Sequence, residues 1–149
     1  MFIIDEPHGL FCHLHSAAHR GLGYNFDQLR RYEEEGRCSS LIIVYGIMAD
    51  KDLDAIIPLM PADATYIFTA PATDRALPAA EILRRYTAAG RGRAYTADSV
   101  RQAVQMALGL AQTLSGQTNR SASAAKPVPP LVFIGGSAFV VAEALPLFR

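Results

Sequence analysis

The sequence contains few cysteines: only two of its 149 residues, Cys12 and Cys38. Two cysteines are too few for the disulfide framework that small secreted domains use to compensate for a limited core. We therefore expect both thiols to be free. A chain of this length can form one domain with a sizeable hydrophobic core.

The sequence also lacks an excess of charge of either sign and a long apolar run. Fourteen basic residues balance fourteen acidic ones, which gives no electrostatic reason to expect nucleic acid or an anionic membrane as a partner. No apolar run approaches the roughly 20 residues of a membrane helix, and the N-terminus does not resemble a secretion signal. We expect no membrane or nucleic-acid partner and a cytoplasmic location.

Two common phosphate-binding motifs are missing. The sequence contains neither G-x-x-x-x-G-K-[ST] nor G-x-G-x-x-G, so it has no phosphate-binding loop of either kind. No internal repeat is visible, which gives no indication of a repeat architecture.

The most informative stretch that is present runs from Leu41 to Met60. Residues 41–45 form a continuous apolar run of strand length, which predicts a strand buried on both faces. Gly46 allows a turn, and Asp50 is the expected N-cap of a following helix. The apolar residues of that helix recur three and four positions apart, at Leu53, Ile56, Ile57 and Met60. In open α/β sheets, the loop between such a strand and helix faces the ligand.

Strand and helix patterns alternate along the rest of the chain. Further strands are expected at 2–4, 10–12, 64–69, 93–96 and 131–134, and further helices at 25–35, 79–89 and 138–148. The longest helix is expected between a cap at Thr96 or Asp98 and an end at Gly116, and other helix boundaries are expected at Asn25, Gly36, Pro78 and Gly90. Residues 117–130 are expected to form a flexible loop. The alternation predicts a single-domain α/β fold with three layers and a mostly parallel sheet.

Gly135-Gly136-Ser137 follows the last predicted strand and precedes the last predicted helix. Glycines at such a position let a phosphate approach the backbone, the helix start attracts an anion, and Ser137 adds a hydroxyl. A tight strand-to-helix turn that binds nothing explains the same residues. Both interpretations remain open from the local pattern.

Two cations are expected at the ligand edge of the sheet. Lys51 and Arg75 lie in loops that follow predicted strands, so either could bind a phosphate or a carboxylate. The alternative is that each is solvated or paired with a local carboxylate. Asp50 and Asp52 are most simply carboxylates at a helix start.

The four residues Cys12, His13, His15 and His19 superficially resemble metal ligands. Their spacing does not match the usual zinc patterns, and alternate residues of a strand share a face for many structural reasons. We therefore expect no metal site.

Four motifs together resemble one family. G-I-M-A-D-K-D (46–52), A-T-Y-I-F-T-A (64–70), D-R-A-L-P (74–78) and I-G-G-S-A-F-V-V-A-E-A-L (134–145) are similar, in order and spacing, to the C-terminal domain of folylpolyglutamate synthase/dihydrofolate synthase, a branch of the Mur ligase superfamily. The resemblance covers the chain from about His19 onward. It implies a Rossmann-like domain of the Mur ligase C-terminal type at 21–149, preceded by a poorly matched segment at 1–20.

The resemblance also implies a reaction and a partner. In this family an N-terminal P-loop domain holds ATP and magnesium, and the enzyme joins glutamate to dihydropteroate or a (poly)glutamyl folate through an acyl phosphate. The C-terminal domain supplies one half of the active site. The N-terminal ATPase domain, ATP, folate and glutamate are therefore the implied partners. Since no residue of this chain can replace the missing phosphate cradle, we expect the isolated chain to have no ligase activity.

Several residues correspond to functional positions of the family. The Asp-x-Gly/Ala-His-Asn motif of the family matches Ser16-Ala17-Ala18-His19-Arg20, which makes His19 the candidate catalytic residue. Ser16 and Arg20 stand where the family has aspartate and asparagine, and a serine lacks the two acceptor oxygens of a carboxylate. The other implied ligand-binding residues are Gly136, Ser137, Lys51 and Arg75.

The departures at Ser16 and Arg20 leave a second hypothesis open. The chain would then be a stand-alone Rossmann-like binding or interaction module that has kept the fold and lost the reaction. A different nucleotide-binding α/β protein, such as a flavodoxin-like module, does not account for the four motifs together.

Overall fold

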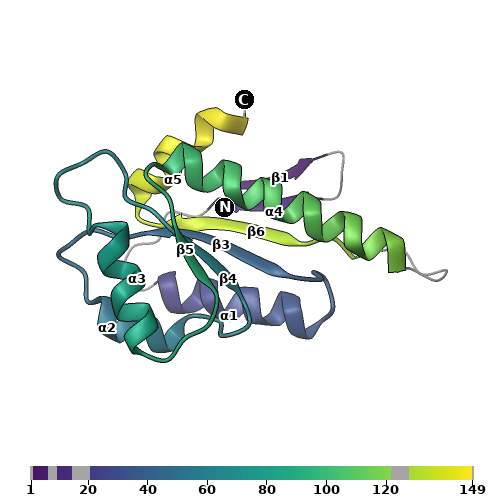
Figure 1. The fold of residues 1–149 in the computed structure, drawn as a ribbon, viewed down its shortest axis with the longest axis horizontal. Coiled ribbons are helices and arrows are strands. Elements are labelled where there is room, and N and C mark those ends of the chain that lie inside the picture. The colour runs from purple at the N-terminus through teal and green to yellow at the C-terminus, as the bar shows by residue number, and fades with distance from the viewer. Residues whose placement is uncertain (1, 7–9, 15–20, 122–127, 149) are drawn as a thin grey trace.

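Strands and helices alternate along the chain in the computed structural model, which describes residues 2–6, 10–14, 21–121 and 128–148 (Figure 1). The strands are β1 (Phe2–Glu6), β2 (Leu10–Leu14), β3 (Leu41–Gly46), β4 (Thr65–Phe68), β5 (Ala94–Thr96) and β6 (Leu131–Gly136). The helices are α1 (Gly21–Glu34), α2 (Leu53–Ile56), α3 (Ala79–Ala88), α4 (Val100–Ser121) and α5 (Ala138–Ala144), with short 3-10 helices η1 (Ile57–Leu59) and η2 (Leu145–Phe148). Each predicted strand is present.

The six strands form one sheet in the order β1-β2-β6-β3-β4-β5. Every neighbouring pair is parallel except β1 and β2, which pair antiparallel. This confirms the prediction of a mostly parallel sheet. β5 lies at one edge, as expected for the short strand around Tyr95.

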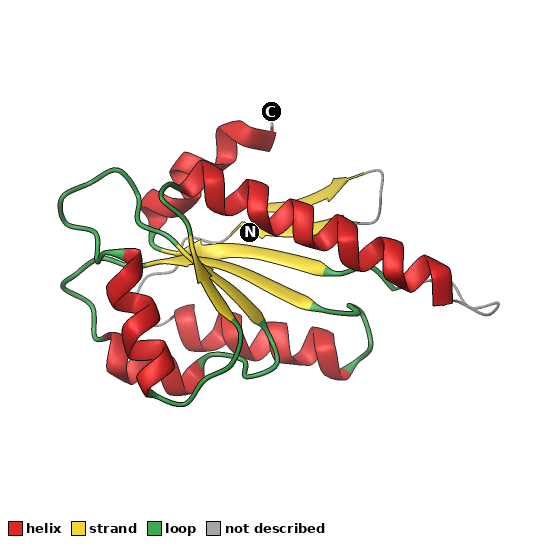
Figure 2. Ribbon diagram, in the orientation of Figure 1, coloured by secondary structure: helices red, strands yellow, loops and turns green. Residues whose placement is uncertain are grey.

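The helices cover both faces of the sheet, which confirms the three-layer α/β prediction (Figure 2). Side chains of α1, α2 and α3 pack with one set of strand residues, and those of α4 and α5 pack with the alternate set. In β3, Leu41, Ile43 and Tyr45 belong to the first group, and Ile42 and Val44 belong to the second. The absence of a polar face on β3 therefore follows from burial on both sides.

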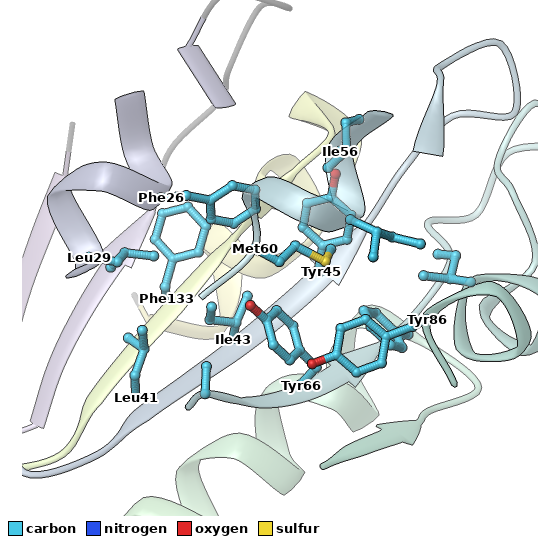
Figure 3. Packing of buried hydrophobic residues seen from close by; sticks show 14 of the residues in the cluster. Phe26, Leu29, Leu41, Ile43, Tyr45, Ile56, Met60, Tyr66, Tyr86 and Phe133 are labelled. Atoms are coloured by element: carbon cyan, nitrogen blue, oxygen red, sulfur yellow. The ribbon is translucent and has the colours of Figure 1, made fainter. Parts of the chain in front are cut away.

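The core beneath α1, α2 and α3 is rich in aromatic rings (Figure 3). The ring of Tyr86 lies 5.1 Å from that of Tyr66 and 5.3 Å from that of Phe68, measured between centroids. These are separations at which aromatic pairs attract beyond their burial. Tyr66 donates its hydroxyl to the carbonyl of Pro61 at 2.7 Å, so this buried polar group is paired.

Both cysteines were expected to be free thiols, and Cys38 is a free, buried thiol. Burial raises its pKa to about 11. Cys12 lies in β2, and its side chain is outside the described part of the structure. No helix within the described ranges is long and apolar enough to cross a membrane.

The predicted starts of two helices, α2 and α4, were wrong. The N-cap of α2 is Asp52, whose carboxylate accepts from the backbone N–H of Ala55, whereas Asp50 lies in the preceding turn. The first turn of α4 is capped by Ser99, whose hydroxyl accepts from Gln102 N–H at 3.0 Å, in place of Thr96 or Asp98. The side chain of Gln102 in turn accepts from Asp98 N–H, so two hydrogen bonds of Gln102 hold the first turn of α4 to the residues before it.

Other helix boundaries also differ from expectation. α1 begins at Gly21, so Asn25 lies inside it, and Pro78 occupies the N-cap position of α3. α2 changes to the 3-10 helix η1 where Pro58 lacks the N–H that a continued α-helix requires. α4 does not end at Gly116 but continues to Ser121, so the predicted loop at 117–130 begins later. A single glycine costs a helix only about 1 kcal/mol, which the packed turns of α4 can offset.

Candidate functional site

The carboxyl ends of β3, β4 and β6 meet at one edge of the sheet, because these strands are parallel and adjacent. The loop from Ile47 to Asp52 leaves β3, the loop from Thr69 to Pro78 leaves β4, and Ser137 follows β6. Ligands of open α/β sheets bind at this edge. Three of the four motifs on which the family resemblance rests therefore lie together in space.

Two glycines let the ends of β3 and β6 approach closely. Gly136 has φ of +100°, and a Cβ atom on it would lie 2.2 Å from the carbonyl oxygen of Gly46. A Cβ atom on Gly46 would lie 2.6 Å from the carbonyl oxygen of Thr69. The backbone packing of three adjacent strand ends thus requires glycine at both positions.

Ser137 is engaged within the turn. Its N–H donates to the carbonyl of Gly46 at 2.9 Å, and its hydroxyl accepts from Phe139 N–H at 3.1 Å, which caps α5. The residue is buried, with 8% of its surface exposed. These contacts account for the Gly135-Gly136-Ser137 turn as a tight strand-to-helix connection. The hydroxyl proton of Ser137 is not used by the capping bond.

A cleft of about 420 Å³ lies at the same edge and brings the two predicted cations together. It is lined by Met48, Ala49, Asp50, Lys51 and Arg75. Lys51, Asp50 and Arg75 are exposed. Since Lys51 comes from the loop after β3 and Arg75 from the loop after β4, their proximity is a tertiary feature that confirms the expected placement of both residues at the ligand edge.

The backbone of the two loops is joined at this cleft. Ala49 N–H donates to the carbonyl of Arg75 at 2.8 Å, and Leu77 N–H donates to the carbonyl of Ile47 at 2.9 Å. Met48 and Ala76 form an isolated antiparallel bridge between these bonds. The position of Arg75 relative to Lys51 is therefore fixed by backbone hydrogen bonds, although both side chains reach into solvent.

Neither cation of the cleft forms an ion pair with another described side chain. The salt bridges among the described residues are Arg30–Asp27, Arg37–Glu35, Arg84–Glu81 and Arg85–Glu81. The cleft lining carries one negative charge, on Asp50, and two positive charges, on Lys51 and Arg75. The cleft can therefore attract an anionic ligand, and a guanidinium can bind a carboxylate or phosphate through two parallel hydrogen bonds.

A second hollow, of about 500 Å³, also contains two cationic side chains, but these are paired with a carboxylate. It is lined by Asp54, Arg84, Arg85, Ala88 and Ala89. Glu81 binds both of its arginines, at 2.6 Å for Arg84 and 2.8 Å for Arg85. Hydrogen bonds from Arg84 and then Arg85 lower the pKa of Glu81 to about 2. Because these cations are already paired, this hollow is a weaker candidate for an anion site.

Two residues near the cleft were missed by the sequence analysis. The guanidinium carbon of Arg75 lies 5.6 Å from the ring centroid of Phe139, and the carboxylate of Glu143 accepts from Ala72 N–H at 2.6 Å. Both side chains belong to α5 and are four residues apart, which places them on one face of the helix. That spacing was visible in the sequence, but the loop that they contact was not.

The remaining predicted site residues, Ser16, His19 and Arg20, lie outside the described residues. β2 ends at Leu14, which pairs with Ile134 of β6, and α1 begins at Gly21. Of the four residues considered as metal ligands, Cys12 and His13 lie in β2, whereas His15 and His19 are not described. Within the described ranges, no group of three or more His, Cys, Asp or Glu residues is placed to hold a metal ion.

The sheet order, the two helical layers and the ligand edge define an α/β protein of the Rossmann-like class. The sequence matches no protein-family model and no curated protein. Its fold is nevertheless similar to solved structures of folate ligases. Folylpolyglutamate synthase of Mycobacterium tuberculosis complexed with ADP matches with a TM-score of 0.73 and 20% identity, over 93% of this chain and 30% of that chain.

Two further structures show the same likeness. Bifunctional folylpolyglutamate synthase/dihydrofolate synthase of Yersinia pestis, complexed with AMPPNP and a Mn ion, matches with a TM-score of 0.64 and 15% identity, over 93% of this chain and 29% of that chain. Folylpolyglutamate synthase of Thermotoga maritima matches with a TM-score of 0.59 and 16% identity, over 99% and 30%. This chain thus spans about 30% of the length of the M. tuberculosis and T. maritima enzymes. The similar structures come from the family that the four sequence motifs resemble.

Proposed function

We propose that this chain is the C-terminal domain of an ATP-dependent ligase that joins glutamate to dihydropteroate or a (poly)glutamyl folate. The observation that carries the proposal is the cleft at the ligand edge, where two motifs of the family resemblance, 46–52 and 74–78, bring Lys51 and Arg75 together. The shared fold with folylpolyglutamate synthases supports it. The proposal places the protein in cytoplasmic folate and one-carbon metabolism.

The cleft fits the chemistry of the proposed ligands. Glutamate carries two carboxylates, ATP carries phosphates, and the reaction passes through an acyl phosphate. Lys51 and Arg75 provide cations for such groups, and Gly136 and Ser137 lie at the same edge. The proposal also includes His19 as the catalytic candidate, although this residue lies outside the described part of the chain. The cleft lining contains a single carboxylate, that of Asp50. One carboxylate does not supply the several oxygen ligands that magnesium requires. ATP and magnesium are therefore assigned mainly to another part of the enzyme.

The proposal requires a partner domain. The chain spans only about 30% of the similar ligases and contains no P-loop motif. We assign the phosphate cradle to an N-terminal ATPase domain, against which the ligand edge of this domain closes. Lys51 and Arg75 would then face the incoming glutamate or the phosphates, and amide formation would depend on both domains.

A second candidate function rests on one specific observation. Ser16 and Arg20 stand where the family has aspartate and asparagine, and neither side chain can reproduce the lost contacts. A stand-alone binding module that has lost the reaction would tolerate these changes. In that case the cleft would bind an anion without catalysis.

The decisive experiment is to sequence the DNA upstream of the Met1 codon and translate it in frame. An open frame that encodes G-x-x-G-K-[ST] within an ATPase domain supports the ligase, and the longer product should then form ATP- and glutamate-dependent amides. A stop codon immediately upstream contradicts the single-chain ligase and supports the stand-alone module. An intact longer product that fails to form the amide also contradicts the ligase.

A further inference from the structure

The cleft depends on a loop that has little regular structure of its own. Between β4 and α3, the chain from Thr69 to Pro78 carries Arg75 to the mouth of the cleft. On one side, the loop is bound to residues 47–49 through the backbone bonds described above. Those bonds fix the backbone of Arg75, but they leave its long side chain free to rotate.

The loop is also contacted by α5. Val140, Val141 and Ala144 of this helix are buried against the sheet, whereas Phe139 and Glu143 lie on the exposed side. Phe139 is 45% exposed, yet its ring lies 5.6 Å from the Arg75 guanidinium carbon. This separation is within the range of a cation–π interaction.

Glu143 adds a second attachment one helical turn further along. Its carboxylate accepts from the backbone N–H of Ala72 at 2.6 Å, a charge-assisted bond to a loop residue three positions before Arg75. The helix that carries both contacts is capped by Ser137. One short helix therefore connects the Ser137 turn to the loop that carries Arg75.

We propose that Phe139 and Glu143 are positioning residues that hold the Arg75 guanidinium at the mouth of the cleft, where it binds a carboxylate or phosphate group. The identity of the bound anion rests on the proposed function. Phe139 attracts the guanidinium over its ring, and the guanidinium N–H groups that do not face the ring can bind the anion. Glu143 limits movement of the loop toward solvent.

The orientation can be measured without any ligand. In NMR spectra of the full 149-residue chain, the Phe139 ring should shift the side-chain protons of Arg75 upfield. The shift should disappear in Phe139→Leu and persist in Phe139→Tyr, which keeps an aromatic face. NMR relaxation of the Arg75 side-chain nitrogen measures the mobility of the guanidinium. This mobility should increase in Phe139→Leu and in Glu143→Ala. It should stay at the parental level in Glu143→Gln, which keeps an acceptor oxygen.

The functional consequence is tested by titration with L-glutamate and, separately, with inorganic phosphate. Phe139→Leu should raise the Kd for the probe that binds by about two- to fivefold, as expected for losing an exposed cation–π contact. Phe139→Tyr should restore the parental Kd. Because Phe139 is 45% exposed, both Phe139 variants should unfold at the parental denaturant concentration.

Each outcome distinguishes the two proposals. If the parent chain shows no ring-current shift, or if neither Phe139→Leu nor Glu143→Ala changes Arg75 mobility, the positioning role is overturned. An unchanged Kd in Phe139→Leu also overturns it. If the parent binds neither probe while the shift and the mobility changes are present, the positioning role stands and the anion-binding part of the proposed function is contradicted.

Discussion

The carbonyl oxygen of Gly46 leaves no room for a side chain on Gly136, because a Cβ atom on Gly136 would lie 2.2 Å from this oxygen. The same oxygen accepts the N–H of Ser137 at 2.9 Å. The contact therefore joins the end of β3 to the start of α5. It also explains two glycines of the family-like motifs by packing, without reference to a ligand.

Substitution of Gly136 by alanine should lower the free energy of unfolding by about 2–4 kcal/mol. The cost combines a left-handed φ that disfavours a side chain with a steric clash against backbone. Urea unfolding measures the change. Gly109→Ala is the control, since Gly109 lies in α4 with open space around it and should gain up to about 1 kcal/mol. Parental stability of Gly136→Ala would contradict the observed contact.

Asp52 and Asp50 should differ in their effect on stability although they are two residues apart. Asp52→Ala removes the carboxylate that accepts from Ala55 N–H and should cost about 1 kcal/mol. Asp50→Ala removes an exposed cleft residue and should leave the thermal midpoint unchanged. The reverse order of the two midpoints would restore Asp50 as the helix cap.

The Cys38 thiol should make the protein less stable at alkaline pH. Burial raises the pKa of Cys38 from 9.0 to about 11, so an unfolded chain loses this proton at a lower pH than the folded chain does. The contribution of the protonated thiol to the free energy of unfolding is fully present below pH 9.0 and is lost as the pH rises toward about 11. In Cys38→Ala, the free energy of unfolding should fall less between pH 9.0 and about 11 than in the parent, as measured by urea unfolding. Parallel curves for the two proteins would refute the assignment.

Arg75→Gln should weaken binding of L-glutamate or phosphate to the cleft by about tenfold, the cost of one lost hydrogen bond to a charged group. Arg84→Gln is the matched control, because Arg84 is paired with Glu81 in the second hollow. Isothermal titration or NMR titration gives both values. An equal loss in the two variants would indicate a general charge effect and not a site at Arg75.

The purified chain should form no amide from glutamate and a folate or dihydropteroate when ATP and magnesium are supplied. The reason is the missing phosphate cradle, since the sequence contains no P-loop motif. Product formation can be followed by mass spectrometry, with a complete folylpolyglutamate synthase as positive control. Ligase activity of the chain alone would disprove the split-site interpretation.

The sequence predicted those features that arise from local patterns. The run at 41–45 has no polar face, and β3 is indeed buried from both sides. The fold class follows from the alternation of such runs with helical spacing. Helix boundaries were less predictable, because Asp50 and Asp52, or Asp98 and Ser99, are chemically suitable caps within two positions of each other. The choice between them depends on where the preceding turn directs the backbone.

The candidate site was predictable only in part. Lys51 and Arg75 were expected at one edge because both follow parallel strands, and the structure confirms that placement. The contacts of Phe139 and Glu143 with the Arg75 loop were missed, since they join residues more than sixty positions apart in the chain. The roles of Ser16, His19 and Arg20 stay predictions.

The place of β6 in the sheet has a consequence for how the protein is made. β2 and β3 each pair with β6 and not with each other, so the strand synthesised last fills the space between two strands synthesised early. Until residues 131–136 leave the ribosome, the β1–β2 hairpin has no partner, and an isolated hairpin is marginally stable at best. Truncation before residue 131 would separate the sheet into two pieces with exposed edges, which are prone to aggregate.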